Sequence, residues 1–103
     1  MKKCSYKLLF VNIYSSDSMA RYLLSSYILK AYLSKFYTSP ELLIKIINIA
    51  DSAPVSEICE QIIKEKPDYI GYSCYIWNIE KIIEAIANLK KIQESILHIL
   101  GGP

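Results

Sequence analysis

Four short apolar runs divide the chain, and each is separated from the next by a segment long enough to form a helix. The runs are rich in Ile, Val, Leu and Tyr, which is typical of buried strands, and they occupy residues 7–14, 42–49, 69–75 and 96–100. Between them, apolar residues recur at the three- and four-residue spacing of a helix with one buried face. Strands that alternate with helices pair in parallel through right-handed crossovers. The sequence therefore predicts an α/β domain built on a parallel sheet.

The three predicted helices each follow a segment that suits a helix start. Residues 15–18 and 51–54 contain Ser and Asp, whose side chains accept bonds from free amides, and Pro54 suits a first turn. Asn78 occupies the N-cap position of the third helix. The first helix is expected from Met19 to about Lys35. The inner stripes of the second and third helices are predicted to comprise Val55, Ile58, Cys59, Ile62 and Ile63, and Ile79, Ile82, Ile83, Ile86 and Leu89.

This pattern favours a three-layer, Rossmann- or flavodoxin-like fold with strand order 2-1-3-4. Because the pattern stops on its fourth strand, we expect residues 1–103 to be the N-terminal portion of a longer protein, truncated before strand five. Such a fragment is expected to self-associate through its open sheet edge. In these sheets ligands bind beyond the carboxyl ends of the strands, at the switch between strands one and three. The loops at that edge are residues 14–18, 50–54, 73–78 and 101 onward.

The composition of the chain gives no indication of binding to nucleic acid or to a membrane. The net charge of +2 is small and the lysines are scattered, so nothing indicates nucleic-acid binding. The three cysteines are far apart and no signal peptide precedes them, which favours a reducing, cytoplasmic setting. No apolar stretch approaches the roughly 20 residues that cross a bilayer, so no membrane association is expected.

The end of the third predicted strand and the loop after it hold the most distinctive residues. Ser73, Tyr75 and Trp77 combine a small hydroxyl with two aromatic rings at a strand's carboxyl end, which suits one wall of a flat, largely apolar pocket. The alternative is that the two rings merely cover the end of the sheet. Gly101 and Gly102 follow the fourth strand, where a missing Cβ permits either close approach of a ligand or a tight turn.

No catalytic set can be assembled from the sequence. It contains no Ser-His-Asp arrangement, paired-carboxylate site or P-loop. The single histidine, His98, falls inside the fourth predicted strand and is expected to be a core residue satisfied by a neighbour. We therefore expect no catalysis by this chain alone, and whether the complete protein is an enzyme stays open.

Three segments of the chain match a known protein family in their order and in their separation along the sequence. They are residues 8–12, Pro67-Asp68-Tyr69-Ile70-Gly71-Tyr72-Ser73, and Ile99-Leu100-Gly101-Gly102-Pro103. With them, nearly the whole chain resembles the N-terminal cobalamin-binding domain of cobalamin-dependent radical S-adenosylmethionine (radical SAM) proteins. In that family the serine after strand three and the glycine pair lie beside the buried nucleotide tail of the corrinoid. The resemblance gives those roles to Ser73, Gly101 and Gly102. It places the corrin ring over Trp77 and the loop after strand one, so the remaining predicted cofactor-binding residues are Tyr14, Ser15, Ser16, Asp17, Met19 and Tyr75.

One departure from related corrinoid carriers concerns the cobalt ion. Carriers of the methionine synthase type have Asp-x-His-x-x-Gly after strand one, and their histidine binds cobalt from below. The corresponding stretch here begins at Asp17, with Met19 at the histidine position and Tyr22 at the glycine position. A thioether is a poor substitute for imidazole on cobalt. The resemblance therefore implies cobalamin bound base-off, with no histidine or other metal ligand from this chain.

The resemblance implies a corrinoid-binding module that works with a downstream domain carrying an iron–sulfur cluster and S-adenosylmethionine. The whole enzyme would perform a radical methyl transfer or rearrangement. The Cys-x-x-x-Cys-x-x-Cys cluster motif is absent here, because the cysteines are Cys4, Cys59 and Cys74.

Two other hypotheses remain open. In the second hypothesis the chain is a degenerate flavodoxin-like scaffold that binds no cofactor and serves to dock another domain or a partner. Met19 and Tyr22 would then fill the space that the nucleotide tail of cobalamin would otherwise occupy. The N-terminal domain of methylthio-transferring radical SAM enzymes is a third hypothesis. It requires a cysteine at the end of strand one, where this chain has Asn12-Ile13-Tyr14.

Overall fold

The structure is a computed structural model that describes residues 5–14, 30–31 and 42–101. Lys30 and Ala31 are helical, and the rest of the helix predicted from Met19 to Lys35 lies outside the described residues. The other elements are β1 (Tyr6–Tyr14), β2 (Leu42–Ala50), α2 (Val55–Lys64), β3 (Tyr69–Ser73), α3 (Ile79–Ile92) and β4 (Leu97–Gly101).

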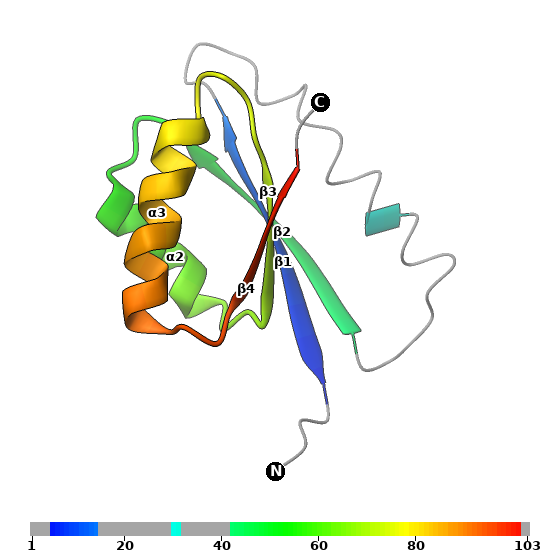
Figure 1. The fold of residues 1–103 in the computed structure, drawn as a ribbon. Helices are drawn as coiled ribbons and strands as arrows, with labels where there is room; N and C mark the ends of the chain where they lie inside the picture. Colours follow the sequence, from blue (N-terminus) through cyan, green and yellow to red (C-terminus); the bar gives the residue numbers. More distant parts are fainter. Residues whose placement is uncertain (1–4, 15–29, 32–41, 102–103) are drawn as a thin grey trace.

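The described strands form one parallel sheet in the order β2-β1-β3-β4 (Figure 1). This confirms the predicted α/β fold and strand order. The helices α2 and α3 lie side by side against one face of the sheet. The third strand is shorter than expected, since it ends at Ser73 and leaves Tyr75 in a loop, and the fourth runs one residue further, to Gly101. Neither helix is long and apolar enough to cross a membrane, and the same holds for the remaining described residues.

The hydrophobic core lies between the sheet and the two helices. Alternate residues of β1 and β3 face it because strand side chains alternate between faces, and the helices meet them with their inner stripes. The side chains involved are Leu9, Val11, Ile13, Ile49, Ile70 and Tyr72 from the strands, Ile58, Cys59, Ile62, Ile82, Ala85 and Leu89 from the helices, and Ile96 just before β4. Each aliphatic side chain buried this fully contributes about 1.5–3 kcal/mol.

The predicted inner stripes are confirmed except at Ile79, which is half-buried but not packed against the core cluster, and at Ile83. Ile83 is 56% exposed, because it follows the fully buried Ile82 and is rotated about 100° around α3, away from the sheet. Val55, Ile63 and Ile86 are half-buried and pack against the core.

The segment Pro67-Asp68 fixes the amino ends of three strands. Pro67 is buried, and Asp68 Oδ2 accepts a hydrogen bond of 2.8 Å from the Lys7 amide. The Asp68 amide donates to the Lys7 carbonyl at 2.9 Å, and its carbonyl accepts from the Leu97 amide at 3.1 Å. These bonds hold β1, β3 and β4 together where each begins.

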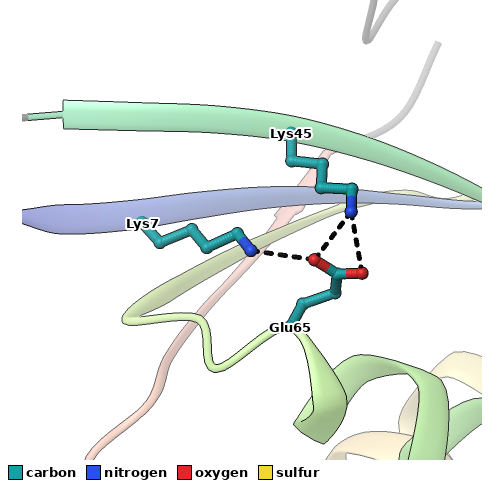
Figure 2. A network of polar contacts seen from close by, with 3 residues as sticks. All are labelled: Lys7, Lys45 and Glu65. Atoms are coloured by element: carbon teal, nitrogen blue, oxygen red, sulfur yellow. Dashed lines mark hydrogen bonds and ion pairs between the residues drawn. The ribbon is translucent and has the colours of Figure 1, made fainter.

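Glu65 joins the end of α2 to two strands. Its carboxylate lies 2.8 Å from Lys7 Nζ on β1 and 2.9 Å from Lys45 Nζ on β2 (Figure 2). The hydrogen bonds from Lys7 and then Lys45 lower the pKa of Glu65 below its ordinary value. Lys66 follows in a left-handed conformation, with φ of 52°, which ends the helix and turns the chain toward β3.

The strand β4 forms one edge of the described sheet, and most of its side chains are exposed. Leu97, Ile99 and Leu100 are 54%, 51% and 48% exposed, so the prediction of a buried fourth strand is wrong for these residues. The reason is position: β4 pairs with β3 on one side, and no other strand of the described ranges pairs with its outer side. Ile96, which precedes the strand, is buried.

Candidate functional site

One row of residues crosses the described sheet close to the carboxyl ends of its strands. The register pairs Asn48 of β2 with Asn12 of β1, and Ser73 of β3 with Gly101 of β4. Asn12 Nδ2 donates to Asn48 Oδ1 at 3.0 Å, and Ser73 Oγ donates to Asn12 Oδ1 at 2.9 Å. We call Asn48, Asn12 and Ser73 the polar row, which ends at Gly101. It lies on the sheet face opposite α2 and α3, because its β1 member alternates with the core-facing Val11 and Ile13.

Asn12 is the buried centre of the polar row. Its side chain is 0% exposed, and a buried amide without partners would cost about 1–3 kcal/mol for each unsatisfied group. Hydrogen bonds to both neighbouring strands satisfy it. Neither Asn12 nor Asn48 was among the site residues predicted from the sequence. The available signal was an asparagine inside each of two apolar strands, Val11-Asn12-Ile13 and Ile47-Asn48-Ile49.

Gly101 leaves open space at the end of the polar row. A Cβ added to it would meet only the Tyr72 carbonyl oxygen, at 3.9 Å, which is an ordinary contact. Packing within the described residues therefore does not require a glycine here. The Cys74 amide donates to the Gly101 carbonyl at 2.7 Å, which holds the loop after β3 against the end of β4.

That loop forms an apolar pocket. The pocket has a volume of about 540 Å³ and is lined by Cys74, Tyr75, Ile76, Trp77 and Ile79. The rings of Tyr75 and Trp77 stack, with centroids 4.4 Å apart and planes 7° from parallel. Trp77 is 48% exposed and Ile76 is 96% exposed. The aromatic pair thus presents a flat apolar surface to the outside.

Asn78 holds this loop against the sheet. Its Oδ1 accepts from the Tyr75 amide at 2.7 Å, and its Nδ2 donates to the carbonyls of Ile13 and Ser73, each at 3.0 Å. Asn78 does stand at the N-cap of α3, as predicted, but its side chain makes no capping bond to the helix. The amide instead satisfies carbonyls at the ends of β1 and β3, which the sequence pattern could not indicate.

The cysteines near the core are held as neutral thiols. Burial raises the pKa of Cys74, although a backbone hydrogen bond with Gly101 opposes the shift. Burial, followed by the charge of Glu84, raises the pKa of Cys59, whose Sγ donates to the Ala85 carbonyl at 3.6 Å. Neither thiol is activated as a nucleophile or metal ligand.

His98 lies on the helix-covered face of the sheet. Its Nδ1 is 2.9 Å from the Tyr72 hydroxyl, the two rings stack, and its buried Nε2 has no partner among the described atoms. Burial, followed by the charge of Lys90, lowers the pKa of His98. The neighbour expected for His98 is therefore the Tyr72 hydroxyl, which contacts Nδ1 of the ring. Within residues 5–14, 30–31 and 42–101, no group of three or more His, Cys, Asp or Glu residues could hold a metal ion.

The structure places half of the predicted cofactor-binding residues. Ser73 and Gly101 meet in register, Tyr75 and Trp77 share the adjoining pocket, and Tyr14 ends β1 at the same edge of the sheet. The Tyr14 carbonyl accepts from the Asp51 amide at 2.7 Å, which ties this edge to the loop after β2. The other five predicted cofactor-binding residues lie outside the described residues: Ser15, Ser16, Asp17, Met19 and Gly102. Cys4 and Tyr22 also lie outside them.

The chain is similar in sequence to a family of known proteins and to one characterised enzyme. The model of the B12 binding domain family matches residues 26–103. Over 51 residues, 50% of the chain, the sequence is 33% identical to the cobalamin-dependent radical SAM methyltransferase TokK of Streptomyces tokunonensis. The matched segment spans 7% of that relative. Because the family model matches most of its length, the chain belongs to the B12-binding domain family.

Proposed function

We propose that this chain is the cobalamin-binding module of a radical SAM enzyme and that it holds the cofactor at the carboxyl edge of its sheet. The observation that carries the proposal is the register of Ser73 with Gly101, beside the buried amide of Asn12. Ser73 and Gly101 lie on adjacent strands. The missing Cβ of Gly101 leaves room for a side arm of the ligand, and the Ser73 hydroxyl offers that side arm a polar contact.

The described residues fit a corrinoid. The nucleotide tail of cobalamin would lie beside Ser73 and Gly101, where an added Cβ meets only one carbonyl, at 3.9 Å. The corrin ring, a flat macrocycle, would lie over the stacked Tyr75 and Trp77, whose pocket of about 540 Å³ is largely apolar. In the proposal Gly102 continues the tail slot, and Tyr14, Ser15, Ser16, Asp17 and Met19 border the ring.

The proposal includes cobalamin bound base-off without a histidine ligand from this chain. His98 pairs in register with the core-facing Ile70, so it is on the opposite face of the sheet from the polar row. Its Nδ1 is engaged with the Tyr72 hydroxyl. No imidazole of the chain is therefore placed to reach a cobalt ion above the carboxyl edge.

For the complete protein we extend the proposal to a downstream domain that binds an iron–sulfur cluster and S-adenosylmethionine. The support is the similarity to TokK, a cobalamin-dependent radical SAM methyltransferase, over half of this chain. Bound cobalamin would supply methyl-transfer or radical chemistry, and this module's own residues would bind and orient it. Residues 1–103 would be the N-terminal, cytoplasmic portion of that protein.

A corrinoid titration tests the binding proposal. The full-length protein is titrated with aquocobalamin and followed by absorbance, and we expect a saturable change toward the base-off spectrum. Gly101→Val should abolish it by filling the tail slot, whereas Asn88→Ala, on an exposed part of α3, should leave it unchanged. No spectral change with the unaltered protein would contradict the proposal and favour the cofactor-free scaffold.

A further inference from the structure

We propose that the outer face of α2 and α3 is a docking surface for a second copy of this chain. The two helices lie side by side in the layer that covers one face of the sheet (Figure 1). Between them runs a groove of about 720 Å³, whose lining includes Cys59 and Ile63 from α2 and Ile92 from α3. The groove shares no residue with the polar row or the aromatic pocket, so the inference goes beyond cobalamin binding.

The groove exposes apolar side chains to the outside. Ile92, the last residue of α3, is 61% exposed, and Ile63 of α2 is half-buried. A single exposed isoleucine is ordinary on a monomer, but two that line the same groove form a connected apolar surface. A second copy that covered this surface would displace water from it, which favours association.

Charged side chains border the groove in the same order on both helices. On α2 the acidic Glu60 precedes Lys64, and on α3 Glu84 precedes Lys91. Burial, followed by the charge of Glu84, raises the pKa of Cys59, so Glu84 lies near the groove. Each helix joins two parallel strands and therefore runs in the opposite direction to them. Both acidic residues thus lie toward the carboxyl edge of the sheet, and both lysines toward its amino edge.

These four charges are not paired with one another. In the described part of the chain none of them takes part in an ion pair, although Glu60 and Lys64 have a spacing that permits one. By contrast, Glu65 at the end of α2 pairs with two lysines of the sheet. The helix macrodipole favours acidic residues in the first turn only, and Glu60 and Glu84 are each the sixth residue of their helix. The charges are therefore available to a partner.

The order of the charges makes the surface complementary to itself. A two-fold axis that crosses both helices would lay each helix antiparallel on the same helix of the second copy. Lys64 would then face Glu60 of the second copy, Lys91 would face its Glu84, and the two grooves would meet between them. A partner of uniform charge would instead meet two like charges. We therefore assign the groove to a second copy.

The size of this face indicates a weak dimer. Helices of 10 and 14 residues are about 15 and 21 Å long, and two side by side are about 20 Å wide, so each copy would bury roughly 300–400 Å². A standard interface buries about 800 Å² per partner. We therefore expect a reversible dimer that forms at high protein concentration. It should weaken severalfold as salt rises from about 0.05 to 0.5 M, because exposed charges are then screened.

Charge swaps test the pairing by analytical ultracentrifugation of the full-length protein. An acidic variant carries Lys64→Glu and Lys91→Glu, and a basic variant carries Glu60→Lys and Glu84→Lys. Each variant alone should self-associate at least about tenfold more weakly, because like charges would then meet across the axis. An equimolar mixture of the two should restore the dimer, since every acidic residue of one variant then faces a lysine of the other.

Two exposed isoleucines of α3 provide a matched control for the apolar contact. Ile92→Ser, in the groove, should weaken the dimer about tenfold. Ile83→Ser should leave it unchanged, because Ile83 is similarly exposed but lies about 180° around the helix from Ile92. Circular dichroism shows whether each variant is folded. If a charge variant is unfolded, the two isoleucine variants decide.

The outcomes separate this inference from other forms of association. A monomer at every concentration would overturn the second copy as occupant and leave the groove to another protein. A dimer that survives both charge variants, or a mixture that stays monomeric, would also overturn it. Loss of the dimer in Ile99→Lys alone would assign association to the edge of β4 and overturn the docking surface. Corrinoid binding by the same variants should be unchanged, so either proposal can fail without the other.

Discussion

The side-chain amide of Asn78 donates to the backbone carbonyl of Ser73 at 3.0 Å, and so joins the start of α3 to the carboxyl end of β3. The same nitrogen donates to the Ile13 carbonyl of β1 at 3.0 Å. One asparagine, 1% exposed, therefore fixes the loop that carries Tyr75 and Trp77 relative to the polar row. Asn78 therefore ties the aromatic pocket to the strand end that carries Ser73.

Replacement of Asn78 by Ala should destabilise the protein strongly. The change leaves the buried Ile13 carbonyl and the partly buried Ser73 carbonyl and Tyr75 amide without their partner, so we expect a loss of about 3 kcal/mol in the free energy of unfolding. Urea denaturation measures it, with Asn88→Ala as the exposed control. A loss below about 0.5 kcal/mol for Asn78→Ala would show that water replaces these bonds.

Replacement of Gly71 by Ala should also be destabilising, for a steric reason. An added Cβ would lie 2.9 Å from Cδ1 of the Phe10 ring, so the ring or the strand must shift. We expect a loss of about 1–3 kcal/mol in thermal or urea unfolding. Gly101→Ala is the matched control, because its Cβ would meet only a carbonyl oxygen at 3.9 Å. Phe10→Leu should relieve the defect in the double variant, and failure of that rescue would contradict the steric explanation.

Stability should fall as the pH is lowered from about 7.5 to 5.5. Burial lowers the pKa of His98, so below the ordinary histidine value of about 6.5 the unfolded chain takes up a proton that the folded chain resists. The stabilisation is complete above that value and is lost progressively as the pH falls from it toward the lower pKa of the folded state. The urea midpoint at the two pH values measures the effect, and His98→Gln should flatten the dependence. An unchanged dependence in that variant would assign the effect to other groups.

The exposed edge strand should cause the chain of 103 residues to self-associate. Leu97 and Ile99 are each about half exposed on one face of β4, and no strand of the described ranges pairs with the outer edge of β4. Static light scattering should show species larger than a monomer as concentration rises, and Ile99→Lys should reduce them. A monomer at high concentration for the unaltered chain would contradict this expectation.

The fold could be predicted from sequence because its determinants are local. The apolar runs of β1, β2 and β3 and the stripes around Ile58 and Ile82 are visible within single segments. The order 2-1-3-4 is the flavodoxin-like topology favoured for strands that alternate with helices, and the described sheet has this order. The exposure of β4 was mispredicted because burial depends on which strand lies at the edge, and an apolar run does not reveal that.

The candidate site was predictable only in part. Ser73 and Gly101 stand at strand ends, which a pattern can locate, and both lie at the predicted edge. The partnership of Asn12 with Asn48 depends on the register between two strands 36 residues apart, which no local pattern specifies. The same is true of Asn78, whose side chain bonds to the end of β1 and not to its own helix.

The polar row takes its members from strands that are distant in the sequence, so it exists only once the entire sheet has assembled. A compound bound there would have affinity for the native state and none for the unfolded chain, and would raise the melting temperature in proportion to the logarithm of its concentration. The cellular supply of such a compound would then govern the abundance of this protein, since chains made while it is scarce would unfold more often and be degraded sooner.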